Sequence, residues 1–143
     1  MPFIFYWPGK ITPGKSDAMV SQLDFLYSFA KMNNLNLQEN DGPDSFEMLD
    51  VLLGKSDKGR EWIVEHNGTW SIIKGDWKYI YPSNRPAYNK STNTELGNNP
   101  EPQLYNLSSD LGEKKNLATQ YPDKVKELEE LLQKIIDDGR TRE

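Results

Sequence analysis

The spacing of hydrophobic positions changes several times along the chain and predicts distinct segments. Phe3–Trp7 is a continuous apolar run that a Pro-Gly pair closes. Such a run is typical of a strand buried on both faces of a parallel sheet. Ser21 is a predicted helix N-cap with Asp24 as its capping-box partner, and an apolar face continues the helix to about Met32.

Apolar and polar residues alternate after residue 60, which predicts an antiparallel meander. Asn67-Gly68 is the strongest short hairpin signal in the chain and separates two of the alternating runs. A second tight turn follows at Lys74-Gly75-Asp76. The predicted strands are Glu61–His66, Thr69–Ile73, Trp77–Tyr81 and Leu104–Leu107.

Two further segments complete the pattern. The stretch from Pro82 to Pro102 is rich in Asn, Pro, Ser, Thr and Gly, and a loop of that length in a compact domain is commonly functional or flexible. Pro122 begins a helix whose apolar residues repeat at spacings of three and four until about Asp138. The fold class is therefore predicted as α+β, with a four-stranded antiparallel sheet packed by a C-terminal amphipathic helix and preceded by a strand-helix piece.

Composition and charge exclude several classes of protein. The 143 residues include 17 Lys and Arg against 22 Asp and Glu, for a net charge of -5, whereas nucleic-acid binders need a basic face. No apolar run approaches the roughly 18 residues of a membrane span, so no membrane partner is expected. Met1 is followed at once by apolar residues without a basic region, so we find no signal peptide. The chain has no Cys and one His, which excludes thiolate chemistry and a multi-histidine zinc site.

The residues alone provide no complete catalytic constellation. His66 lies beside the predicted Asn67-Gly68 turn, where it is either a partly exposed structural histidine or a hydrogen-bond donor to a polar ligand. Asp41 and Asp44 suggest a metal site, but two carboxylates in a Pro-Gly turn more often form Asx turns. Three tryptophans on neighbouring predicted strands suit either core packing or stacking on a sugar, namely Trp62, Trp70 and Trp77.

The linear order of short motifs resembles the sulfatase family of the alkaline phosphatase-like superfamily. Five groups match in order and cover nearly the whole chain. Within the long loop, Tyr88–Lys90 and Asn93–Gly97 resemble carbohydrate-active members, including arylsulfatases and N-acetylgalactosamine-6-sulfatase-like enzymes. The matching groups are Pro2–Ile11, Val20–Leu26, Asp41-Gly42 with Leu52–Gly54, Ser71–Ile80, and Leu104–Leu107 with Asp110, Glu113 and Asn116–Ala118.

The resemblance implies that the chain is the C-terminal part of such an enzyme. Residues 1–55 would be a remnant of the α/β sulfatase domain and residues 56–143 the C-terminal subdomain. Sulfatases convert the first residue of a Cys- or Ser-x-Pro-x-Arg motif to formylglycine and hold a calcium ion, but no such motif occurs here. The resemblance therefore implies no cofactor and no catalytic residue in this chain, and formylglycine and calcium only in the full-length enzyme.

The expected function is a sulfuric ester hydrolase that acts on sulfated carbohydrates or aryl sulfates, with this piece inactive alone. The expected partner is the N-terminal catalytic part of the same enzyme, with a dimer through the exposed N-terminal strand as a further partner. His66 is the candidate substrate-binding residue, and the Pro82–Pro102 loop a candidate lid or rim. Family members are often periplasmic or secreted. The alternative is a stand-alone carbohydrate-binding or protein-interaction module.

Overall fold

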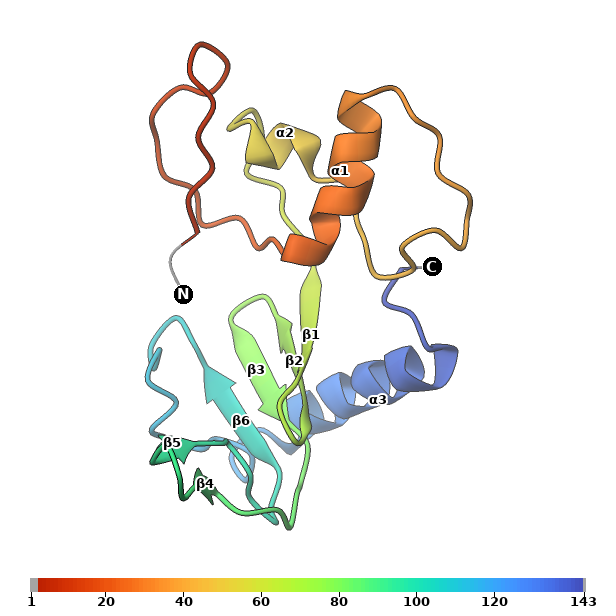
Figure 1. Ribbon diagram of the computed structural model, residues 1–143. Helices are drawn as coiled ribbons and strands as arrows, with labels where there is room; N and C mark the ends of the chain where they lie inside the picture. The colour runs from red at the N-terminus through yellow and green to blue at the C-terminus, as the bar shows by residue number, and fades with distance from the viewer. Residues whose placement is uncertain (1–2, 143) are drawn as a thin grey trace. The chain divides into compact units, whose positions relative to one another are not determined.

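The computed structural model describes residues 3–142, which divide into two compact units (Figure 1). The first unit contains the described residues up to Glu61 together with residues 140–142, and the second runs from Trp62 to Gly139. Residues 56–61 and 140–142, on the C-terminal side of the predicted 55/56 boundary, thus lie with the first unit.

The second unit is built on a four-stranded antiparallel sheet, as the alternating pattern predicts. Its strand order is β1-β2-β3-β6, so three strands form a meander and the fourth returns beside the third. The short strands β4 (Tyr88–Asn89) and β5 (Thr94–Glu95) form a separate hairpin within the long loop. The sheet strands are β1 (Trp62–His66), β2 (Trp70–Lys74), β3 (Trp77–Ile80) and β6 (Gln103–Asn106).

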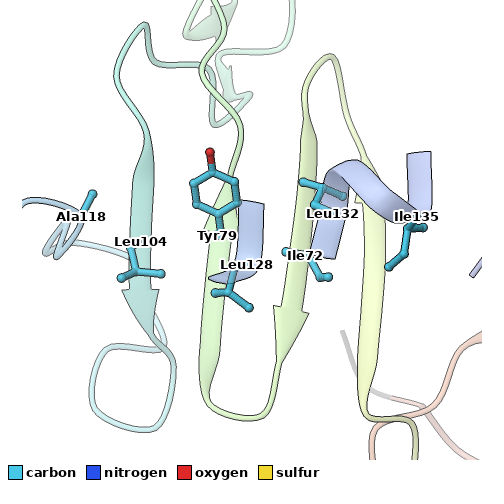
Figure 2. Close-up of a cluster of buried hydrophobic side chains, with 7 residues drawn as sticks. All are labelled: Ile72, Tyr79, Leu104, Ala118, Leu128, Leu132 and Ile135. Atoms are coloured by element: carbon cyan, nitrogen blue, oxygen red, sulfur yellow. The ribbon is translucent and has the colours of Figure 1, made fainter. Parts of the chain in front are cut away.

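The helix α3 (Pro122–Asp138) packs on one face of this sheet and completes the core. Pro122 begins the helix, and Gly139 ends it in the left-handed conformation with φ 64°. Figure 2 shows three helix side chains facing aliphatic and aromatic residues of the strands. The buried cluster consists of Ile72, Tyr79, Leu104, Ala118, Leu128, Leu132 and Ile135.

Burial of Tyr79 predicts a loss of stability in alkali. Desolvation raises the pKa of its phenol above the usual value of about 10, and Glu129, whose Oε1 accepts a hydrogen bond from the phenol at 3.1 Å, raises this pKa further. The neutral phenol is therefore favoured in the fold, and its stabilisation is fully present below about pH 10 and lost as the pH rises above that value. Tyr79→Phe should lose less thermal stability than the wild type between about pH 9 and pH 11.

Thermal melts of both proteins across this range measure the difference in slope. Tyr6→Phe is the matched control because the Tyr6 side chain is exposed. If Tyr79→Phe and the wild type lose stability in parallel, Tyr79 does not contribute in this way.

The first unit begins with a helix whose start matches the predicted capping box. Ser21 accepts the Leu23 amide, while the Asp24 carboxylate accepts the Ser21 amide at 2.8 Å. A 3-10 turn, Gln22–Asp24, leads into α1 (Phe25–Met32), and a short helix α2 (Leu49–Leu52) follows. Prediction and structure agree at both ends of the longer helix.

Asp24 also takes part in a buried ion pair that closes the first unit. The Arg60 guanidinium donates to both Asp24 oxygens, with Nε–Oδ2 at 2.8 Å and Nη2–Oδ1 at 2.6 Å. The Phe46 amide donates to the same carboxylate at 2.9 Å, and Arg60 lies over the Phe46 ring. Asp24 is 0% exposed and Arg60 7%. One carboxylate therefore joins the helix start to two segments distant in sequence.

The prediction of a strand over Phe3–Trp7 is wrong for this chain. Among the described residues this segment pairs with no strand. Instead, the rings of Phe3 and Phe5 pack on Phe25 of α1, at centroid distances of 5.9 and 6.4 Å. An apolar run indicates burial but does not supply the neighbouring strand that a parallel pairing needs. Pro2 lies outside the described residues.

Candidate functional site

The end of the β1–β2 hairpin places His66 directly opposite Trp70. The two residues are cross-strand partners, and their ring centroids lie 4.5 Å apart. The predicted hairpin is present, with a loop of three residues in which Gly68 has φ 78°, a conformation that favours glycine. Within residues 3–142 no hydrogen bond to the imidazole is formed. The exposed His66 ring is thus able to donate and accept.

Only one of the three candidate tryptophans is exposed at the sheet. Trp62 and Trp77 pack against the buried cluster, which confirms the core-packing interpretation for them. Trp70 is 40% exposed although it lies on the same face as Ile72, two residues on, which is fully buried. The sugar-stacking interpretation is therefore retained for Trp70 alone.

The long Pro82–Pro102 loop lies against this hairpin end (Figure 1). It is closed on itself by a bond from the Ser83 amide to the Asn99 carbonyl at 2.7 Å. A methyl group built on Gly68 would lie 3.7 Å from Asn98 Nδ2 and 3.8 Å from Arg85 Nη1. Asn98 is buried, donates to the Pro86 carbonyl, and leaves its Oδ1 without a hydrogen-bond partner among the described residues.

Sequence reasoning missed Arg85, which the loop brings to the Asn67-Gly68 turn. Across residues 3–142 its guanidinium has no hydrogen-bond or ion-pair partner, while its backbone amide donates to Ser83 Oγ. The same segment also contains Lys90, Glu95 and Glu101, so no feature of the sequence singled out this arginine. The hairpin end therefore presents an imidazole, an indole and an unpaired guanidinium.

The structure gives the candidate metal residues other roles. Asp41 Oδ2 accepts the Gln38 amide at 2.7 Å, and Asp44 Oδ1 accepts the Thr141 amide at 2.8 Å. No group of three or more His, Cys, Asp or Glu suited to a metal ion occurs among residues 3–142. Both carboxylates thus accept backbone hydrogen bonds, Asp41 from a residue of its own turn and Asp44 from a residue near the C-terminus.

Several residues that carry the family resemblance have structural contacts. Backbone amides of Lys115 and Lys114 donate to Asp110 and hold the pKa of its carboxyl below the usual range. Asn116 Oδ1 accepts the Leu104 amide at 3.0 Å and so fixes the end of β6. Glu113 pairs with Lys78 at 2.7 Å. These motifs indicate a shared fold rather than a shared reactive centre.

Comparisons with known proteins identify the source of this fold. The chain is 48% identical over 137 residues to an N-acetylgalactosamine-6-O-sulfatase of Bacteroides thetaiotaomicron, covering 94% of this chain and 27% of that enzyme. The chain is a homologue of sulfatases. It corresponds to their C-terminal part and spans about a quarter of the length of the curated relatives it matches.

Further relatives and solved structures agree with this assignment. Human arylsulfatase A is 28% identical over 130 residues, covering 81% of this sulfatase homologue and 25% of that protein. A solved structure from a study of the metabolism of multiple glycosaminoglycans by Bacteroides thetaiotaomicron aligns with TM-score 0.86 and 48% identity, covering 90% of this chain and 27% of that one. No family model matches the sequence.

A more distant structure supports the fold alone. A protein structure solved in complex with D-glucosamine-2-N,6-O-disulfate aligns with TM-score 0.61 at 21% identity, covering 90% of this chain and 26% of that one. Among residues 3–142, no helix is both long and apolar enough to cross a membrane.

Proposed function

We propose that this chain is the C-terminal portion of a sulfatase, a sulfuric ester hydrolase that acts on sulfated carbohydrates or aryl sulfates. The observation that carries the proposal is the 48% identity to an N-acetylgalactosamine-6-O-sulfatase over 94% of the chain. Identity at that level over nearly the whole chain favours a common substrate class.

The residues present do not fit the reactive groups of such an enzyme. Sulfate ester cleavage needs an activated nucleophile, a cation on the sulfate oxygens and an acid for the leaving alcohol. The sequence contains no Cys- or Ser-x-Pro-x-Arg motif, and the described residues contain no cluster of metal ligands. Formylglycine and calcium would therefore belong to the N-terminal catalytic portion.

The first unit supplies a surface for that N-terminal portion. Ile4 and Tyr6 are 85% and 83% exposed, and Leu26 of α1 is 49% exposed. Exposed apolar groups of this size are costly in water and mark interaction surfaces. We propose that the N-terminal catalytic portion covers the Phe3–Trp7 segment. A dimer through that segment is the competing arrangement.

We further propose that residues 1–55 belong to the α/β sulfatase domain and residues 56–143 to the C-terminal subdomain. The complete enzyme would be periplasmic or secreted.

A graft tests the proposed function. This chain replaces the matched 137-residue segment of the Bacteroides enzyme, whose own front portion is retained. Release of sulfate from a 6-O-sulfated N-acetylgalactosamine substrate supports the proposal. A folded graft that releases none contradicts it, provided that the unaltered enzyme is active in the same assay.

His66 is the proposed substrate contact within this portion, because its exposed imidazole has both hydrogen-bonding nitrogens available. In the graft, His66→Ala should raise KM and lower kcat/KM by about tenfold, the value of one or two hydrogen bonds to a polar ligand. His66→Gln retains a donor and an acceptor and should recover part of the loss. Unchanged kcat/KM in His66→Ala would remove His66 from the site.

A further inference from the structure

One end of the sheet in the second unit carries an exposed aromatic ring and, close to the same turn, a cation with no hydrogen-bond or ion-pair partner for its guanidinium among the described residues. Trp70 is 40% exposed at the first position of β2, and Arg85 reaches the adjacent Asn67-Gly68 turn. Neither residue belongs to the motifs that carry the family resemblance. Both lie in the second unit, so their relation depends only on that unit.

Trp70 has one ring contact, and hydrogen bonds fix the backbone around it. Its cross-strand partner His66 lies at a centroid distance of 4.5 Å, with the two rings inclined by 56°. The Trp70 carbonyl accepts the Tyr81 amide at 2.8 Å, and Thr69 Oγ1 donates to the Tyr81 carbonyl at 2.9 Å. An indole fixed on a strand offers a large flat surface at low entropic cost, which suits the apolar face of a pyranose ring.

Arg85 adds charge at the same end of the sheet. A methyl group on Gly68 would lie 3.8 Å from both its Cδ and Nη1, so the side chain follows the hairpin turn. Its planar guanidinium matches the oxygens of a sulfate or carboxylate in a bidentate manner. Because no described carboxylate pairs with it, binding an anion requires no ion pair to be broken.

We infer that Trp70 and Arg85 form a binding surface for a sulfated sugar residue, with the indole against the pyranose ring and the guanidinium on the sulfate. The inference rests on the proposed function, which supplies sulfated glycans as the ligand class. The surrounding loop is polar and nearly free of aliphatic residues, which disfavours an apolar protein partner. The net charge of -5 disfavours a nucleic acid.

The test is a titration of the 143-residue chain with a 6-O-sulfated N-acetylgalactosamine oligosaccharide and its unsulfated counterpart. Amide and indole NMR shifts give Kd and locate the contact. The wild type should bind the sulfated sugar more tightly. Trp70→Ala should weaken binding of both sugars by about tenfold, because stacking does not depend on the sulfate. Arg85→Ala should weaken only the sulfated sugar, by about tenfold, and abolish the preference.

Lys126→Ala is the matched control, since its side chain is exposed and belongs to α3 of the same unit. Absence of binding, equal affinity for both sugars, or a preference that survives Arg85→Ala would overturn the inference. These results are separate from the graft assay. A graft that releases sulfate with unchanged KM in Trp70→Ala and Arg85→Ala refutes this surface and retains the proposed function, whereas an inactive graft refutes the function itself.

Discussion

Asp24→Asn should be the most destabilising single change in the first unit, with a loss of about 3–5 kcal/mol in the free energy of unfolding. The substitution leaves the Arg60 guanidinium buried without its counter-charge, while Asp24 is 0% exposed and its partner 7%. It also weakens the acceptor of the Ser21 and Phe46 amides. By contrast, the exposed Lys126–Glu130 pair, at 3.8 Å, is worth at most about 1 kcal/mol.

Hydrogen exchange followed by NMR measures this effect locally. Amides of α1 should exchange faster in Asp24→Asn, while those of β2 and β3 serve as an internal reference. Asp17→Asn is the matched control because Asp17 is an exposed acid in the same unit. The double variant Asp24→Leu/Arg60→Met should recover much of the loss, because it removes both charges. A loss below about 1 kcal/mol in the single variant would show that the pair is not buried in solution.

The second large effect concerns activity. The 143-residue chain alone should release no sulfate above the uncatalysed background from an aryl sulfate or a sulfated sugar, because its sequence has no Cys- or Ser-x-Pro-x-Arg motif and residues 3–142 contain no cluster of metal ligands. Ion chromatography of released sulfate measures this, with the graft as the positive control. Turnover that co-purifies with the chain and changes in a point variant of it would contradict this account.

Local chemistry in the sequence predicted most of the second unit. Asn67-Gly68 indicated a reversal, and alternation on either side placed the strands to within two residues of β1 and β2. Spacings of three and four from Val125 onward predicted α3 and the residues that it buries. Each of these signals involves residues that are close together in the chain, so it can be recognised in a single sequence without knowledge of the fold.

Long-range pairings could not be predicted in the same way. The capping box at Ser21 and Asp24 was predictable because its partners are three residues apart, but Arg60 is 36 residues from Asp24. Nothing in the sequence distinguishes that arginine from other cations. The Phe3–Trp7 run indicated a buried strand because it is apolar, but it finds no strand partner among the described residues, and Ile4 and Tyr6 are exposed.

The residues of the candidate site show the same difference between local signals and long-range contacts. His66 was singled out because it is the only histidine in the sequence and lies beside a turn. Arg85 was missed because the long loop that brings it to the Asn67-Gly68 turn has no regular pattern. Exposure alone separates Trp70 from Trp62 and Trp77, and exposure is decided by where α3 packs on the sheet.

The nucleotide sequence immediately upstream of the Met1 codon tests the central claim most directly. We predict a coding stretch, in the same frame or separated by a frameshift, that specifies the remaining three quarters of a sulfatase with a Cys- or Ser-x-Pro-x-Arg motif. Its translation should align with the N-terminal part of the Bacteroides enzyme, up to the point where the match to this chain begins. An upstream sequence with no sulfatase coding in any frame would contradict the claim that these residues complete a longer hydrolase.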